Sequence, residues 1–251
     1  MDAESRLSAL VGLLQRDGRL DVRETAEALG TVEMTIRRDL DRIVTMGIAR
    51  RVRGGAISLL MRGEELPFAM RVLERKAAKE RIAAAVAGVL RDGEVVLLDS
   101  GTTALEIAKA LAGRRLTVMP MSLHAASVVA ANESVRLLMP GGETRPGELA
   151  LIGPLALASI GALRFDTAVL TCCGLADGRV TAHDLGDAAV KQAMAAAAAR
   201  VILATDSAKF RQTAMAVVCE ASAADMVITD GEAPADDVDA LRAAGLEVRC
   251  V

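Results

Sequence analysis

The sequence has almost no aromatic side chains. Its 251 residues include no tryptophan, no tyrosine and only three phenylalanines, although 52% of them are hydrophobic. Proteins that bind single-stranded nucleic acid without sequence preference stack the bases on aromatic side chains, so the composition argues against this class. The apolar content is mainly aliphatic, and a chain of this length can bury one large core or two modest ones.

Long apolar runs and leader segments are also lacking. The alanine-rich stretch 194–199 ends at Arg200, far short of the roughly 20 apolar residues that a membrane-spanning helix needs. The first residues do not show the charged and then apolar pattern of a secretory signal. We therefore expect a cytoplasmic protein with no membrane partner.

Cysteine is scarce, and its positions do not match the spacing of metal ligands. Two of the cysteines are adjacent, and neighbouring residues on one strand face opposite sides of a sheet. The four residues are Cys172, Cys173, Cys219 and Cys250. We interpret them as reduced core thiols, and we expect neither a metal site nor a cofactor.

Charge is unevenly distributed along the chain. The formal net charge is −3, but the segment 35–57 holds six arginines against two aspartates, a local net charge of +4. A basic segment in an otherwise acidic protein is the electrostatic feature expected of a surface that binds nucleic acid.

Three short helices are predicted at the start of the chain. The segment 5–15 places apolar residues at helical spacing, and Asp21 is positioned to cap a second helix over 22–29. A third helix is predicted over 32–46, where Gly47 ends it. The segment 48–57 reads as a basic strand, a Gly-Gly turn and a return strand. This order is typical of a winged helix-turn-helix.

The third predicted helix divides its residues between two faces. Ile36, Leu40 and Ile43 cluster on one side, whereas Arg38 and Arg42 fall opposite. Arginines on such a helix can bond guanine in the major groove, and those of the wing suit phosphates or the minor groove. The residues expected to contact DNA are Thr35, Arg37, Arg38, Arg42, Arg50, Arg51, Arg53 and Gly54. The alternative is that these are solvated charges on a small helical domain.

At this point a family resemblance appears. The segment Thr35-Ile36-Arg37-Arg38-Asp39-Leu40, followed by Gly47 and by Arg53-Gly54-Gly55-Ala56, resembles the amino-terminal signature of the DeoR family of bacterial transcription regulators. The match covers residues 5–57. The resemblance implies that the partner of this segment is a double-stranded DNA operator.

The rest of the chain alternates between aliphatic strands and helices. Residues 58–74 contain Gly, Pro and mixed charges and are interpreted as a linker that can include a helical turn. Beyond it, strands are predicted at 94–98, 116–119, 135–139, 167–171, 201–204, 215–219, 226–229 and 246–251, with helices at 76–90, 103–111, 123–131, 154–162, 188–199 and 236–244. This pattern predicts an α/β domain over 75–251, with a parallel sheet covered on both faces, after a winged helix-turn-helix over 1–57.

Polar loops follow several of these strands, at the edge where open parallel sheets bind ligands. Asp99-Ser100-Gly101-Thr102-Thr103 runs into a helix whose free amides and dipole suit a phosphate or another anion; the alternative is an ordinary capping turn. Lys209 stands beside Asp206 and could bind a phosphate or form a surface ion pair. Lys191 lies near a helix start, where the pattern alone indicates a solvated face.

These loops together resemble the carboxyl-terminal sensor domain of the same family, which is similar in fold to ribose-5-phosphate isomerase and to CoA transferases. The matching stretches are 99–103, 141–142, 188–194 and 206–210. Where the family usually has Thr-Asn-Ser, this chain has Pro120-Met121-Ser122, so that only the serine matches. The resemblance implies a phosphorylated sugar or similar small anionic effector bound by Asp99, Ser100, Gly101, Thr102, Thr103, Ser122, Gly141, Gly142, Lys191, Asp206 and Lys209.

The resemblance implies a regulator of a sugar or carbohydrate operon, most often a repressor in this family, and we expect no catalytic residues. A small DNA-binding unit needs repeated half-sites, so we expect a homo-oligomer, either a dimer or a tetramer. One alternative is a sugar-phosphate isomerase or CoA-transferase-like enzyme that carries a DNA-binding module and uses Asp206 as a base. Another is a sensor fold that serves only as an oligomerisation scaffold.

Overall fold

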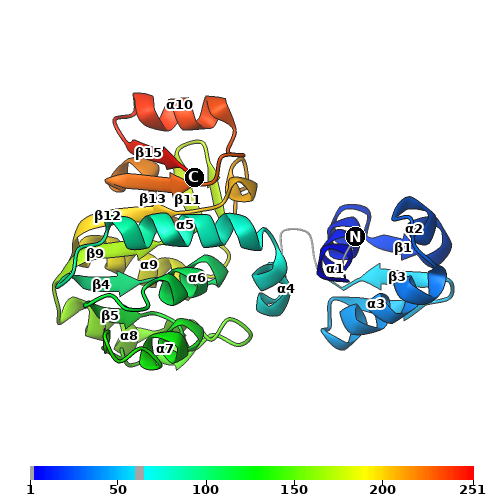
Figure 1. The fold of residues 1–251 in the computed structure, drawn as a ribbon, viewed down its shortest axis with the longest axis horizontal. Helices are drawn as coiled ribbons and strands as arrows, with labels where there is room; N and C mark the ends of the chain where they lie inside the picture. Colours follow the sequence, from blue (N-terminus) through cyan, green and yellow to red (C-terminus); the bar gives the residue numbers. More distant parts are fainter. Residues whose placement is uncertain (1–2, 60–64) are drawn as a thin grey trace. The chain divides into compact units, whose positions relative to one another are not determined.

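The chain folds into two units. The computed structural model describes residues 3–59 and 65–251, and it separates a unit of Met1–Glu74 from a unit of Arg75–Val251. Figure 1 shows the helices and strands of each. Residues 60–64, which belong to the segment expected to be a linker, lie outside the described residues.

The amino-terminal unit is a winged helix-turn-helix. Its helices and strands are α1 (Ala3–Asp17), β1 (Arg19–Asp21), α2 (Val22–Ala28), α3 (Glu33–Thr45), β2 (Ala49–Val52) and β3 (Gly55–Ser58). The three helices and the β2–β3 hairpin lie where the sequence predicts them. Strand β1 was not predicted, because three residues are too few to show an alternating pattern; it pairs antiparallel with β3.

The glycines of the wing turn are needed for its geometry. Gly54 has a φ of +80°, in the left-handed region, where residues with a Cβ atom are disfavoured. A Cβ atom on Gly55 would lie 1.8 Å from the carbonyl oxygen of Leu20. Only glycine therefore lets β3 approach β1 this closely.

The described part of the expected linker belongs to the amino-terminal unit. Ser58 ends β3, and Phe68–Leu73 form a helix, α4. Leu66 and Met70 are buried in the same hydrophobic core as α1 and α3. The sequence allowed a helical turn in residues 58–74 but did not locate it, because six helical residues cover fewer than two turns and show little periodicity.

The carboxyl-terminal unit is built on a seven-stranded sheet in the order β15-β14-β12-β9-β4-β5-β6. Its neighbouring strands are parallel, as predicted. The strands are β4 (Val95–Leu98), β5 (Thr117–Pro120), β6 (Arg136–Leu137), β9 (Phe165–Leu170), β12 (Ala198–Ala204), β14 (Met226–Thr229) and β15 (Glu247–Cys250).

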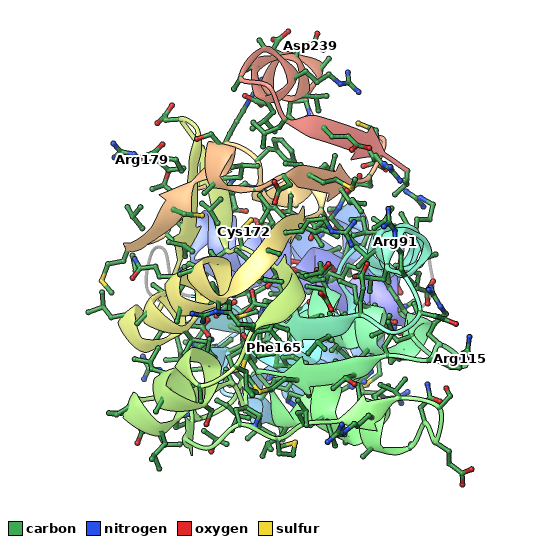
Figure 2. The ribbon with its side chains drawn as sticks, turned by 90° about the vertical axis from the view of Figure 1, so that its left-hand side faces the viewer. Arg91, Arg115, Phe165, Cys172, Arg179 and Asp239 are labelled. Atoms are coloured by element: carbon green, nitrogen blue, oxygen red, sulfur yellow. The ribbon has the colours of Figure 1, made fainter. Side chains whose placement is uncertain are left out.

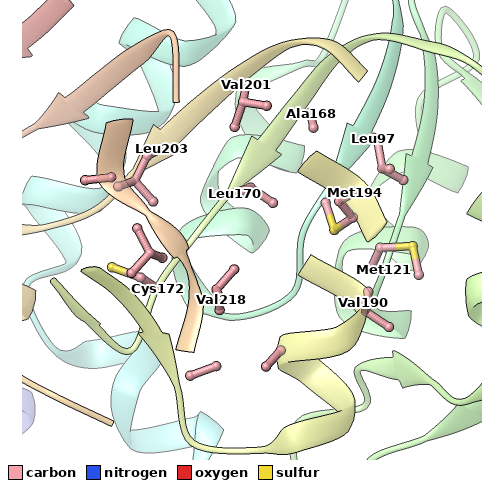
Figure 3. Packing of buried hydrophobic residues seen from close by; sticks show 14 of the residues in the cluster. Leu97, Met121, Ala168, Leu170, Cys172, Val190, Met194, Val201, Leu203 and Val218 are labelled. Carbon is pink, nitrogen blue, oxygen red and sulfur yellow. The ribbon is translucent and has the colours of Figure 1, made fainter. Parts of the chain in front are cut away.

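Helices cover both faces of this sheet. The first face carries α5 (Lys76–Val89), α6 (Thr102–Ala110) and α7 (Leu123–Ala130), and the second carries α8 (Pro154–Gly161) and α9 (Leu185–Ala197). Successive residues of β4 alternate between the two cores: Val96 and Leu98 face the first, whereas Leu97 faces the second. The second core is shown in Figure 3. A further helix, α10 (Ala235–Ala243), packs beside β15.

A second sheet corrects one prediction. The strand expected at 215–219 forms as β13 (Ala216–Glu220), but it is not part of the parallel sheet. It pairs antiparallel with β11 (Arg179–Ala182), which in turn pairs with β10 (Gly174–Ala176). Local composition predicted the strand but could not identify its partner. A short hairpin of β7 (Glu143–Thr144) and β8 (Leu151–Ile152) was also not predicted.

The thiols do not all lie in the core. Cys172 is buried just beyond the carboxyl end of β9, the strand that begins at Phe165 (both labelled in Figure 2), whereas Cys250 is exposed. The interpretation as core thiols is therefore right for Cys172 and wrong for Cys250. Among the helices of the described ranges, none has the length and apolar content to cross a membrane.

Candidate functional site

The outer face of α3 and the wing carry arginines that are free of protein partners. Arg38, Arg42, Arg50 and Arg53 are exposed, and within residues 3–59 and 65–251 their side chains make no hydrogen bond or ion pair. The opposite face of α3 is anchored, because Ile36, Leu40 and Ile43 are completely buried. The helix thus presents cationic side chains to solvent from a fixed backbone.

Arg37 is held only weakly. Its Nη2 donates a hydrogen bond of 2.8 Å to Glu33, one turn earlier on α3, and both side chains are about half exposed. Exposed helical pairs of this kind are worth about 0.3–0.5 kcal/mol. A phosphate group on DNA can therefore replace Glu33 at little cost.

Arg51 connects the wing to α3. Its Nε donates to a carboxylate oxygen of Asp41 at 2.9 Å, and its Nη2 donates to the backbone carbonyl of Arg37 at 2.9 Å. The guanidinium is therefore already engaged, unlike those of the neighbouring Arg50 and Arg53. This geometry fixes the angle between β2 and α3, an internal role that the sequence pattern did not reveal.

A buried ion pair fixes α3 to α1. The Nε of Arg6 donates to Asp39 at 2.6 Å, and the two side chains are 14% and 4% exposed. Asp39 was counted from the sequence as an acid within the basic segment, but the structure turns its carboxylate inward. It therefore does not oppose the arginines on the outer face.

In the carboxyl-terminal unit, Asp99 is the centre of a buried polar cluster at the end of β4. Its Oδ1 accepts a hydrogen bond from the N–H of Ser100 at 2.7 Å. Its Oδ2 accepts bonds from the N–H and the hydroxyl of Thr171, at 2.7 and 3.0 Å, and from the ammonium of Lys191. Asp99 thus joins the carboxyl ends of β4 and β9 to helix α9.

Lys191 is the buried cation of this cluster. Its side chain is 2% exposed, so the interpretation as a solvated residue is wrong. Burial lowers the pKa of Lys191, but the negative charges of Asp99 and Asp187 outweigh it and raise the pKa overall. The ammonium therefore keeps its charge. The amphipathic pattern of α9 did not indicate that Lys191 is buried, because the helix is covered both by the main sheet and by β13.

Arg145 and Glu148, in the loop between β7 and β8, extend the cluster. Neither residue was predicted from the sequence to be part of the site. The Nη2 of Arg145 lies 3.7 Å from Asp187 and 3.8 Å from Glu148. Asp187 in turn accepts a hydrogen bond of 3.4 Å from the hydroxyl of Ser100. An arginine directly after a Gly-Gly-Glu-Thr turn was the only signal in the sequence that pointed to this contact.

The loop 99–103 leads into the start of α6 as predicted. Gly101 has a φ of +93°, and Thr102 and Thr103 are buried in the first turn of the helix. The first amide groups of a helix have no acceptor within it, so they can bind an anion. Ser122 lies at the end of the neighbouring strand, fully buried, where its Oγ accepts a bond from Ala125 and caps α7.

Gly141 and Gly142 have a packing role in the structure. A Cβ atom on Gly142 would lie 2.6 Å from the carbonyl oxygen of Ile152, and one on Gly141 would lie 3.3 Å from the Cβ of Leu155. The two glycines let this segment approach β8 and α8. Their contacts are thus with the base of the hairpin that carries Arg145.

Asp206 and Lys209 lie in the turn after β12. The carboxylate of Asp206 is buried and accepts a bond from the N–H of Ala208 at 3.1 Å. The cation that pairs with Asp206 is Arg75 and not Lys209 as the sequence suggested: the Nε of Arg75 lies 3.5 Å from the carboxylate of Asp206. In the part of the chain that the structure describes, the ammonium of Lys209 has no ion-pair partner.

Cys172 lies next to the cluster but is not activated. Its Sγ is 3.2 Å from the hydroxyl oxygen of Thr205, and burial raises the pKa of the thiol to about 11. The thiolate is the reactive form of cysteine, so this side chain stays protonated and unreactive near neutral pH.

Comparison with known families decides the class of the protein. Residues 6–60 match the family model described as the DeoR-like helix-turn-helix domain, and residues 74–231 match that of the DeoR C terminal sensor domain. The chain belongs to the DeoR family of transcription regulators. The family resemblance stated from the sequence is confirmed, and the chain is a DNA-binding regulator rather than an enzyme.

Several relatives of this DeoR-family chain are named as repressors. It is 32% identical to the transcriptional repressor AccR of Agrobacterium fabrum, over 90% of this chain and 89% of the relative. It is 29% identical to the glycerol-3-phosphate regulon repressor of Escherichia coli K12, over 93% of each. Among solved structures, ribose 5-phosphate isomerase A from Methanocaldococcus jannaschii matches with 14% identity and a TM-score of 0.42, over 55% of each chain.

Proposed function

We propose that this DeoR-family protein is a cytoplasmic repressor of a carbohydrate operon that is controlled by a phosphorylated sugar or a similar small anion. The central observation is that one cationic surface is open to solvent, while a second cation, Lys191, is enclosed beside the start of a helix. Within residues 3–59 and 65–251, Arg38, Arg42, Arg50 and Arg53 have no hydrogen-bond or ion-pair partner, whereas Lys191 is buried beside the start of α6. The first arrangement suits DNA and the second suits a small anion.

On DNA, α3 enters the major groove. Arg38 and Arg42 then bond guanine edges, and Thr35 and Arg37 contact the backbone at the rim of the groove. Arg50 and Arg53, together with the Gly54 turn, contact phosphates or the minor groove. Arg51 acts as a positioning residue, because its guanidinium is committed to Asp41 and to the carbonyl of Arg37.

The effector binds at the carboxyl edge of the parallel sheet. The amides of the 99–103 loop hold its phosphate, with Ser122, Lys191, Asp206 and Lys209 around it and Gly141–Gly142 behind the hairpin. Asp99, Ser100 and Thr102 are each no more than 5% exposed. A ligand can therefore reach these residues only if a neighbouring segment of the chain moves. The β7–β8 hairpin suits this role, because the Nη2 of its Arg145 lies 3.7 Å from Asp187, farther than in a hydrogen bond of ordinary length.

The effector changes DNA affinity by favouring one of two arrangements of the sensor unit. A ligand shifts such an equilibrium only by its difference in affinity for the two states, and the coupling between effector and operator is reciprocal. A small DNA-binding unit gains affinity from repeated half-sites. We therefore propose that the protein acts as a homo-oligomer, a dimer or a tetramer.

Selection of bound sequences from a random DNA pool tests this function. The selection is run with the full chain alone, with glycerol 3-phosphate and with fructose 6-phosphate. We expect one sequence with repeated half-sites to be enriched without sugar, and its recovery to change at least fivefold with one of the two. The Arg38→Ala variant should lose the enrichment, whereas Arg91→Ala, an exposed arginine in the other unit, should keep it. Failure to enrich any sequence would refute the proposal.

A further inference from the structure

Arg75 occupies an unusual position in the chain. It is the first residue of the carboxyl-terminal unit and directly follows Glu74, the last residue of the DNA-binding unit. Its backbone is left-handed, with φ 50° and ψ 34°, a region that residues with side chains rarely adopt. Its carbonyl accepts the first hydrogen bond of α5, from the N–H of Lys79 at 3.0 Å. The conformation of residue 75 therefore sets the direction in which the chain enters α5.

The side chain of Arg75 holds this conformation through the turns that follow β12 and β14. Its Nη2 donates to the hydroxyl of Ser207 at 2.7 Å, to Asp230 at 2.8 Å and to Glu232 at 3.0 Å. Asp230 is completely buried, and its other carboxylate oxygen accepts a bond of 2.6 Å from the N–H of Ser207. One guanidinium thus links the start of α5 to the carboxyl edge of the sheet.

These contacts lie at the proposed effector site itself. Asp206 and Ser207 belong to the turn that would surround the ligand, and the Nε of Arg75 lies 3.5 Å from Asp206. That Nε is buried and has no hydrogen-bond partner within the described residues. A guanidinium has five N–H donors, so Arg75 retains donors that an anion can use.

The local charge is unbalanced in a way that an anion would change. The single positive charge of Arg75 faces three carboxylates, those of Asp206, Asp230 and Glu232. A phosphate arriving beside Asp206 repels these carboxylates and attracts the guanidinium. The contacts that hold residue 75 in its left-handed conformation would then be exchanged for contacts with the ligand.

We infer that Arg75 is the positioning residue through which effector occupancy reaches the chain segment leading to the DNA-binding unit. This inference rests on the proposed function, since it requires an anion at the site of Asp206 and an operator on DNA. It goes further by naming the side chain that converts occupancy into a change of backbone conformation.

The test measures the operator dissociation constant of the full-length protein with and without glycerol 3-phosphate and fructose 6-phosphate. We expect the wild-type value to change at least fivefold with one of them and the Arg75→Ala value to change less than twofold. Arg75→Gly should respond as weakly as Arg75→Ala, because glycine adopts the left-handed conformation freely but lacks the side chain. Arg91→Ala, which removes an exposed arginine beyond the other end of α5, should respond like the wild type.

A second readout separates coupling from simple damage to the fold. Coupling is reciprocal, so operator DNA should change the affinity of the wild type for the sugar phosphate by the same factor, and this effect should also vanish in Arg75→Ala. If Arg75→Ala does not fold, Arg75→Lys keeps the charge without the forked donors and should show a reduced response.

Two outcomes contradict the inference. If neither sugar phosphate alters operator binding by the wild type, the proposed effector function fails and the inference fails with it. If the wild type responds and Arg75→Ala or Arg75→Gly responds equally, only the role of Arg75 is refuted.

Discussion

Replacing Lys191 by methionine tests the buried cluster most directly. Methionine keeps much of the length and volume of lysine but removes its charge, which leaves the carboxylate of Asp99 buried without its cation. Removing one partner of a buried ion pair costs about 3–5 kcal/mol. Asp99 would still accept bonds from Ser100 and from Thr171, so we expect a loss near the lower end, about 3 kcal/mol.

The loss should appear as a lower melting temperature of the carboxyl-terminal unit. For a unit of this size, each kcal/mol lowers the melting temperature by about 2–4 °C, so we expect a decrease of about 6–12 °C. Calorimetry or far-ultraviolet circular dichroism is the suitable assay, because the chain has no tryptophan or tyrosine to report unfolding by fluorescence.

Two control variants make this result interpretable. Lys76→Met removes an exposed lysine that lies 3.9 Å from Glu80, so it should cost no more than about 0.5 kcal/mol. The double variant Asp99→Asn/Lys191→Met has no unpaired buried charge, so it should recover part of the loss. A decrease below about 1 kcal/mol for Lys191→Met alone would refute the account of this cluster.

The pH dependence of this effect follows from the pKa of Lys191, which is raised in the folded protein. A raised folded pKa contributes stability that is fully present below the unfolded pKa, about 10.4, and is lost as pH rises through the folded pKa. The difference in stability between wild type and Lys191→Met should therefore be constant from about pH 6 to 9 and decrease only above about pH 10.4.

Three further predictions concern the amino-terminal unit. Arg38→Ala should lose about 1–3 kcal/mol on the selected operator and much less on random DNA, because its free guanidinium reads bases; equal losses in a gel-shift titration would contradict this role. Arg51→Ala should weaken binding to all sequences alike while lowering the melting temperature of the unit, since it braces α3 against β2; an unchanged melting temperature would argue against the brace. Gly55→Ala should unfold the wing, because its Cβ atom would meet the carbonyl of Leu20 at 1.8 Å; native operator affinity for this variant would show that the turn can adapt.

Much of the fold was predictable because its signals are local. The helices over 5–15, 22–29 and 32–46 were found from helical spacing and from Asp21 as a cap, and the structure places α1, α2 and α3 there. Buried parallel strands read as aliphatic runs, which located β4, β9 and β12 within a few residues. The elements that escaped prediction were short, such as β1 and the β7–β8 hairpin, because two or three residues cannot establish a period.

The chemistry of the site was less predictable because it depends on long-range contacts. The loop 99–103 could be recognised as the start of a helix, but nothing in it indicated that Asp99 binds Lys191, 92 residues away. For the same reason the helical pattern alone indicated a solvated Lys191, and it was included among the effector-binding residues only through the family resemblance. Arg75, Arg145 and Arg6 were not singled out, although each lies against a buried carboxylate.

The sequence by itself determined the family, the winged helix-turn-helix and the parallel α/β sheet, because repeated apolar spacing, caps and glycines act over a few residues at a time. Only the tertiary structure decided which arginines are free for DNA and which are engaged inside the protein. The partner of Arg51, Asp41, lies 10 positions away along the chain, that of Arg6 lies 33 positions away and that of Arg75 lies 155 positions away. An ionic contact needs proximity in space, and spacing along the chain does not report such proximity.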